Sequence, residues 1–200
     1  MDKKKFQIIN WEKSNFSKDK IVLKMNIFNK YVDLESSLKE KNYIIAIGYN
    51  PSNKTSFNDD STNLYLRDKI KNKYPSVMGY ILVNLIPKVE TDSSNVGIND
   101  IDDDYIDEII KLINGHSKFN IVLFFGHLGV NILNSKNDKM KSLKEVLEKA
   151  SDRICYTSRP EDFIHPGRSA DNFNLVDWKE NLLDKKWDGN IKNRNTITFQ

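Results

Sequence analysis

The chain has 200 residues, of which 38% are hydrophobic and 30% are charged. This composition fits a soluble globular protein with one fair-sized core and excludes a disordered chain. No run of about 18 apolar residues occurs, so no membrane span is expected. The formal net charge of +3 permits contact with nucleic acid without requiring it.

The start MDKKKFQIIN has no apolar stretch long enough for a secretory signal, and Cys155 is the only cysteine. We therefore expect a cytoplasmic protein without disulfides. No internal repeat and no Gly/Ser/Pro-rich linker divides the chain. We expect a single domain over residues 1–200, with loose ends at about 1–5 and 185–200.

Apolar segments alternate with helical patterns along the chain. Strands are predicted, in chain order, at 21–28, 43–49, 79–87, 120–126 and 153–157. Helices are predicted at 60–74, 102–115, 127–133, 141–150 and 169–183. The central apolar runs are continuous, as in strands covered on both faces. The fold class is therefore α/β, a three-layer sandwich with a central, mostly parallel sheet.

In such folds, ligands bind beyond the carboxyl ends of the strands. The end of the strand predicted at 43–49 carries Gly48, Tyr49, Asn50, Pro51 and Ser52. Glycine permits close approach, proline ends the strand, and the residue before proline is held extended. The amide of Asn50 then holds either a water or a base edge. Alternatively, the segment is a turn with an Asx hydrogen bond.

The strand predicted at 79–87 carries Asn84 near its end, as a polar residue within the apolar segment LVNLIP. A buried amide without a partner costs on the order of 1–3 kcal/mol, so this side chain needs hydrogen bonds. Nucleobases present paired donors and acceptors that suit an amide. A bond to a neighbouring loop would satisfy it equally well, and both interpretations stay open.

Two later turns complete the set of candidates. Gly126 and His127 lie at the turn from the strand predicted at 120–126 into the next helix, and they offer backbone N–H groups to a phosphate, or are structural. His165 and Arg168, in the segment HPGRS, follow the last strand. Histidine can donate to developing negative charge, and arginine can hold a phosphate or enter a base stack. Alternatively, they are solvated residues at the entry to a helix.

The acidic and metal-binding patterns are less specific. Asp59 and Asp60 form either a paired-carboxylate site or helix caps, and capping suits Asp60 while Asp59 stays open. The three histidines and Cys155 lack zinc spacing. No phosphate-binding or nucleophile-elbow glycine motif occurs. We expect no metal and no cofactor.

Together, these motifs resemble those of the uracil-DNA glycosylase superfamily, over about residues 43–175. In that family a first strand ends in Gly-x-[Asp/Asn]-Pro, as in GYNP here, and a second ends in a base-recognising Asn, as in ILVNLIP. A third strand runs into a Gly-containing turn and helix, to which VLFFGHLGVNIL is similar, and a late loop resembles HPGRS.

The resemblance implies a glycosylase-like fold and roles for the matching residues. Asn50 would position water, as in the mismatch-type enzymes, because it stands where other members have a water-activating Asp. Asn84 would hold the base, His165 would assist its departure, and Arg168 would occupy the wedge position usually held by Leu. Tyr49 or Phe57 would stack on the base.

A more specific similarity is to a bacterial and phage family, domain of unknown function 1643, which has no established activity. Its members share an Asn-Pro-Ser turn, an Asp-Asp-x-Thr segment, a Val-Asn-Leu strand, a Thr-Asp step and an Asn-Asp pair. The matching segments here are NPS (50–52), DDST (59–62), VNL (83–85), TD (91–92) and IND (98–100).

Two functions fit these residues. One is an N-glycosidase, a hydrolase acting on a base in DNA or in a nucleotide, with His165 and Asn50 as the catalytic residues. The other is a non-catalytic protein that binds a nucleotide or a modified base, in a phage or a defence system. Both predict a nucleobase-containing partner and no membrane. The oligomeric state does not follow from the sequence.

Overall fold

The fold is described from a computed structural model, which places residues 7–10, 22–24, 43–51, 61–77, 79–159, 162–163 and 174–177. The strands of this part form one sheet in the order β2-β1-β4-β3-β5-β6-β7, with β8 also paired to β6. Their bounds are β1 Gln7–Asn10, β2 Val22–Lys24, β3 Ile44–Gly48, β4 Gly79–Asn84, β5 Ile121–Leu123, β6 Ile154–Arg159, β7 Asp162–Phe163 and β8 Asn174–Asp177.

The four central strands β4, β3, β5 and β6 are parallel, whereas the strands outside them are antiparallel. Every residue of β3, β4 and β5 is buried. Strands covered on both faces have continuous apolar runs, which explains the unbroken segments in the sequence. The prediction that the three central runs share one sheet is confirmed.

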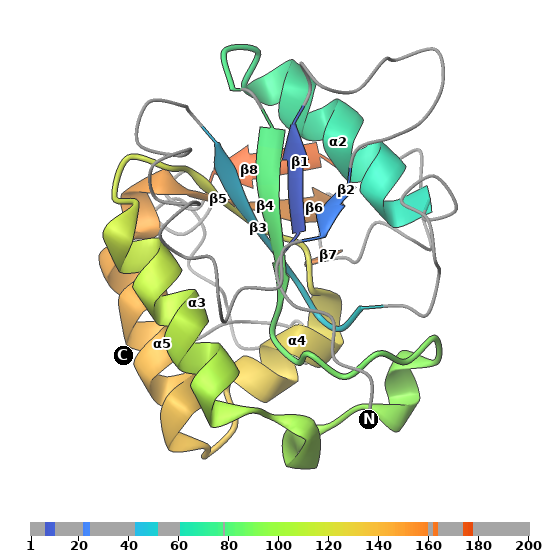
Figure 1. Ribbon diagram of the computed structural model, residues 1–200, viewed down its shortest axis with the longest axis vertical. Coiled ribbons are helices and arrows are strands. Elements are labelled where there is room, and N and C mark those ends of the chain that lie inside the picture. Colours follow the sequence, from blue (N-terminus) through green and yellow to red (C-terminus); the bar gives the residue numbers. More distant parts are fainter. Residues whose placement is uncertain are drawn as a thin grey trace.

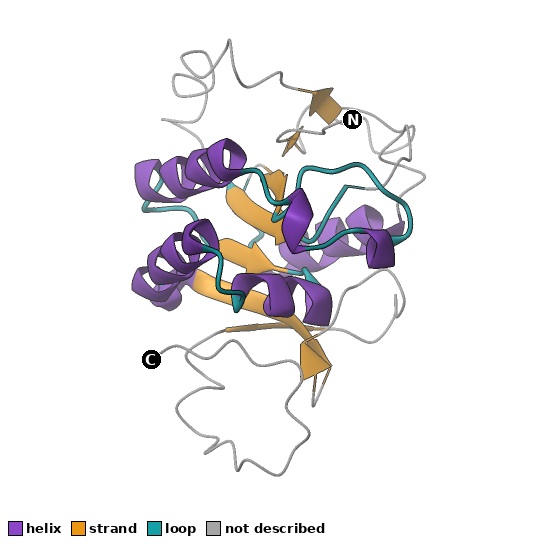
Figure 2. Cartoon of the chain, turned by 90° about the horizontal axis from the view of Figure 1, so that it is seen from below, coloured by secondary structure: helices purple, strands orange, loops and turns teal. Residues whose placement is uncertain are grey.

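Helices cover both faces of the sheet (Figures 1 and 2). Their bounds are α2 Ser61–Lys73, α3 Asp103–Gly115, α4 Gly126–Leu133 and α5 Asp138–Lys149. Leu66 and Ile70 of α2 pack with Ile44 and Ala46 on one face. The helices α3, α4 and α5 pack on the other face, where the larger core lies. The α/β class is therefore confirmed.

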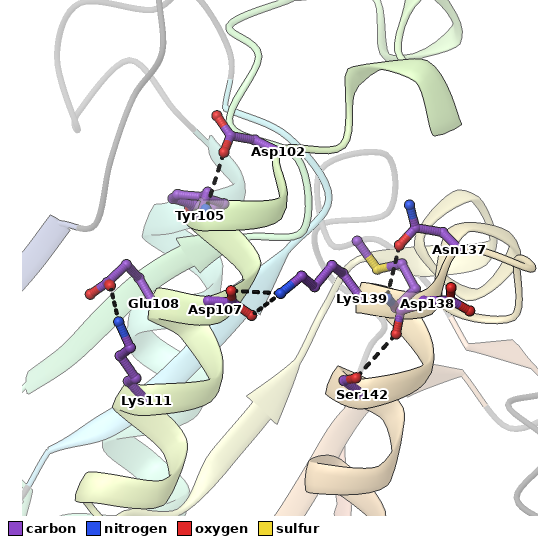
Figure 3. A network of polar contacts seen from close by, with 10 residues as sticks. Asp102, Tyr105, Asp107, Glu108, Lys111, Asn137, Asp138, Lys139 and Ser142 are labelled. Atoms are coloured by element: carbon purple, nitrogen blue, oxygen red, sulfur yellow. Dashed lines mark hydrogen bonds and ion pairs between the residues drawn. The ribbon is translucent and has the colours of Figure 1, made fainter.

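The helices α3 and α5 lie side by side, and an ion pair joins them (Figure 3). The Lys139 ammonium contacts both carboxylate oxygens of Asp107, at 2.8 and 2.6 Å. Each helix is also capped at its start: Asp102 accepts from the N–H of Tyr105, and Asn137 from that of Met140. An exposed pair of this kind contributes little, so apolar packing holds the two helices together.

The helices α2, α3, α4 and α5 match the predicted ones to within a few residues, but the helix expected at 169–183 is wrong. Within that range Asn174–Asp177 form β8, which pairs antiparallel with β6. Leu175 packs against the core on the α2 side. A short edge strand is stabilised mainly by pairing with its neighbouring strand. The local sequence pattern contains no information about that pairing. The short strands β1 and β7 were not predicted, for the same reason.

No helix within the described ranges is long and apolar enough to span a membrane.

Candidate functional site

The carboxyl ends of the central parallel strands bring together a row of residues on the α2 side of the sheet. Gly48 of β3 is in register with Asn84 of β4. On its other side, the N–H of Phe124, which follows β5, donates to the carbonyl of Ile47 at 2.9 Å. Side chains alternate between the faces of a sheet, and Gly48 follows Ile44 and Ala46 on the α2 side. Asn84, Gly48 and Phe124 therefore lie next to one another.

Gly48 is the point of closest contact in this row. A Cβ atom at this position would lie 2.5 Å from Oδ1 of Asn84 and 2.7 Å from Cζ of Phe124. Both distances are too short for real contacts, so the absence of a side chain lets the amide oxygen and the ring occupy the space above the backbone. This explains why β3 ends in glycine.

Asn84 is a buried amide that is held firmly through its backbone. Its side chain and backbone together are 8% exposed. Its N–H extends beyond the last residue paired with β1 and donates instead to the Tyr105 hydroxyl, at 3.2 Å. Among the residues that the structure describes, the side-chain amide of Asn84 has no hydrogen-bond partner. A buried polar group in this condition needs another partner, and a water molecule or a ligand can supply one.

The hydrogen bond from the Asn84 N–H to the Tyr105 hydroxyl is expected to stabilise the folded protein. Burial raises the pKa of Tyr105, so its neutral hydroxyl accepts the Asn84 N–H. Tyr105→Phe would leave that N–H buried without an acceptor, and we expect a loss of about 1–3 kcal/mol in the free energy of unfolding. Urea denaturation measures this loss. Tyr65→Phe, at a half-buried position of α2, is the control, and equal small losses in the two variants would contradict the assignment.

Asn50 joins the loop after β3 to the loop after β4. Its amide nitrogen donates to the carbonyls of Glu90, at 2.7 Å, and of Pro51, at 3.2 Å. The N–H of Glu90 donates in return to the carbonyl of Pro51, at 3.0 Å. These hydrogen bonds of the Asn-Pro turn therefore hold the loop after β3 against the loop after β4. The Asn50 donors are used in it, which leaves the amide oxygen as the group available to a water or a ligand.

Tyr49 points to the opposite face of the sheet. It is buried in the core cluster that contains α3, and its hydroxyl donates to the carbonyl of Val96 at 2.7 Å. Burial, followed by the charge of Asp100, raises its pKa. Its side chain therefore lies away from Gly48 and Asn84, and the aromatic beside the amide is Phe124.

The loop after β4 is stabilised by the acidic residues of the TD and IND segments. Asp92 accepts from the N–H and the hydroxyl of Ser94, at 3.0 and 2.7 Å. Asp100 accepts from the N–H of Gly97 and pairs with Lys88, each at 3.0 Å. The bond from Lys88, followed by that from Gly97, lowers the pKa of Asp100. These two residues give the loop its shape.

The turn after β5 begins α4 at the same edge of the sheet. Gly126 has φ 61°, in the left-handed region that favours glycine, and His127 is the second residue of the helix. Phe125, at the cap position, makes no side-chain cap. The site residues Ser52, Asp59, His165 and Arg168 lie outside the described residues, as does Phe57.

Sequence reasoning missed Phe124 and Thr157 as members of the row. Phe124 is 4% exposed, and Thr157 is fully buried next to it in β6, with its hydroxyl donating to the carbonyl of Leu123 at 3.4 Å. The period of two from Val122 gives the side of the sheet on which Phe124 lies. Its neighbours follow only from the register, which the sequence does not contain.

Cys155 lies deeper under α2 and is not a nucleophile. The Tyr74 hydroxyl donates to its sulfur at 3.4 Å. Burial raises the pKa of the thiol to about 11, so it is protonated at neutral pH. A reactive cysteine needs the thiolate and access to solvent, and Cys155 has neither.

Comparison with known proteins gives one family match. The model of a family described as "Protein of unknown function (DUF1643)" matches residues 33–166. These residues include β3, β4, β5 and β6 and the row at their carboxyl ends. No curated protein sequence and no solved structure matches the chain.

Proposed function

The chain belongs to the DUF1643 family of proteins of unknown function, and from its own residues we propose that it recognises a nucleobase at the carboxyl edge of its sheet and releases that base from its sugar. The Asn84 amide carries this proposal, because it is buried and has no partner within the described part of the chain. A base edge would supply the missing hydrogen bonds. Release of the base from its sugar is the activity that the resemblance to uracil-DNA glycosylases implies.

The proposed reaction is hydrolysis of the N-glycosidic bond. The bond between C1′ and the base nitrogen breaks, and its electron pair leaves with the base. The oxygen of a water molecule bonds to C1′, and the proton that this water loses balances the charge on the base. Asn84 holds the base edge, and His165 donates to the departing base as negative charge develops. The Asn50 oxygen aligns the water, since its nitrogen is held by Glu90 and Pro51.

The second candidate is a protein that binds the base without cleaving the bond. The hydrogen bonds of Asn50 favour this candidate. An amide cannot take a proton from water, and both N–H donors of Asn50 already bind loop carbonyls. In that case Asn84 would recognise a nucleotide or a modified base, and His165 would bind the intact ligand without assisting any bond cleavage.

Incubation with a panel of base-modified oligonucleotides and nucleotides, followed by mass spectrometry of released base and retained ligand, tests both candidates. For the enzyme, we expect His165→Ala to lower the rate by about 10²–10³, with less effect on substrate binding. Asn84→Ala should weaken recognition of the base itself. Arg168→Ala should slow chiefly duplex substrates, in which a wedge residue fills the gap left by a flipped base, and should affect free nucleotides little.

The outcomes separate the two candidates. Tight retention of a nucleotide without base release, lost in both Asn84→Ala and His165→Ala, would overturn the enzyme and support the binding protein. If wild type neither releases a base nor retains a ligand from any member of the panel, both candidates are wrong.

A further inference from the structure

The Asn84 amide has a defined orientation at the edge of the sheet. Its oxygen is the end that approaches Gly48, since Oδ1 lies 2.5 Å from the position that a Cβ there would take. The ring edge of Phe124, through Cζ and Cε2, approaches the same point to within 2.7 and 3.0 Å. The amide oxygen and the ring edge therefore both approach the space above the Gly48 backbone.

The surroundings of the oxygen favour this orientation over the reverse. The Cα–H groups of glycine are weak hydrogen-bond donors, and the edge of an aromatic ring carries partial positive charge. Both attract an amide oxygen. They would repel the NH₂ group, whose hydrogens are also positive, if the amide were turned by 180°. These surroundings therefore favour the oxygen on the side of Gly48, with the nitrogen turned away from Gly48.

We propose that Asn84 presents only N–H donors to its ligand, so that the ligand is recognised through adjacent acceptor atoms. This inference rests on the proposed function and narrows its substrate class. The N3 and O2 edge of cytosine and the N7 and O6 edge of guanine each offer two neighbouring acceptors. Uracil and thymine place an N3–H donor beside each carbonyl, and adenine places an amino group beside N7 and N1. The bound base is then cytosine or guanine, or a derivative that keeps those acceptors.

Binding measurements on the full chain test this proposal. The probes are dCMP, dGMP, dUMP and dAMP, and the same four bases each placed at the single base-bearing position of an otherwise abasic single-stranded oligonucleotide. We expect dCMP or dGMP, or its oligonucleotide counterpart, to bind at least tenfold more tightly than the uracil and adenine probes. Asn84→Asp replaces the donors by acceptors at nearly the same size and should remove that preference. Circular dichroism checks that the variant is folded.

Each outcome has a distinct meaning. Equal or tighter binding of the uracil or adenine probes by wild type overturns the donor-only orientation and leaves the proposed base recognition standing. Unchanged preference in folded Asn84→Asp also overturns it. Absence of binding to all eight probes, together with absence of base release from the oligonucleotide panel, overturns the inference and the proposed function together. Because the wild-type comparison needs no variant, it tests the orientation even where Asn84→Asp does not fold.

Discussion

Gly48→Ala is expected to destabilise the protein and to remove ligand recognition in the same variant. The added methyl group would lie 2.5 Å from Oδ1 of Asn84 and 2.7 Å from Cζ of Phe124. Both neighbours are at most 8% exposed, so neither can move into open space. Overpacking of this kind costs about 1–3 kcal/mol of unfolding free energy. Relief of the clash requires the amide to turn away from the position that we assign to ligand binding.

Gly115→Ala is the matched control for this substitution. Gly115 ends α3, and a Cβ atom there would have no neighbour within 4 Å. We expect its stability to stay within about 0.5 kcal/mol of wild type or to rise, because alanine favours the helix. Urea denaturation and binding of the nucleotide panel are measured on both variants. A Gly48→Ala variant with wild-type stability and wild-type binding would contradict the close contact above β3.

The central parallel strands could be predicted from the sequence, whereas most of the outer strands of the sheet could not. Buried parallel strands such as Ile44–Gly48 and Gly79–Asn84 are apolar at every position, and this signal is local. The edge strand Asn174–Asp177 contains only four residues, of which Leu175 and Val176 are apolar. Its hydrogen bonds come from β6, so the same residues could equally form one turn of a helix. Tertiary pairing decided between the two.

The candidate site shows the same division. The topological rule predicted that Asn50 and Asn84 would lie at one edge of the sheet, because both follow parallel strands. It could not assign the direction of each side chain beyond the strand end. Tyr49 lies on the α3 side and Asn50 turns to Glu90, because the loop from Lys88 to Asp100 supplies carbonyls that accept from both. The contact between Gly48 and Phe124 depends on the register of β3 and β5, which only the folded chain defines.

At the amino ends of the parallel strands, Arg153 joins the start of β6 to the end of α3 and to the connection between α3 and β5. Its guanidinium donates to the carbonyls of Ile113, at 3.0 Å, of His116, at 3.2 Å, and of Phe119. These carbonyls belong to the last turns of α3 and to the connection that leads into β5. The last carbonyls of a helix have no partner within the helix, so a cation with several donors is well suited to this position. Burial lowers the pKa of Arg153, but the group stays charged.

Arg153→Met is therefore expected to lower the free energy of unfolding by about 3 kcal/mol, because three half-buried carbonyls lose a charged donor while most of the apolar stem is kept. Arg153→Lys keeps the charge but lacks the planar fork, and an ammonium cannot reach three carbonyls that diverge, so about half of that loss is expected. Urea denaturation followed by circular dichroism measures both. Because Arg153 lies at the amino end of β6, ligand binding at the carboxyl edge should be unchanged in whatever fraction is folded. If Arg153→Lys matched wild type in stability, charge alone would explain the contact. If Arg153→Met did so, the three bonds would contribute nothing.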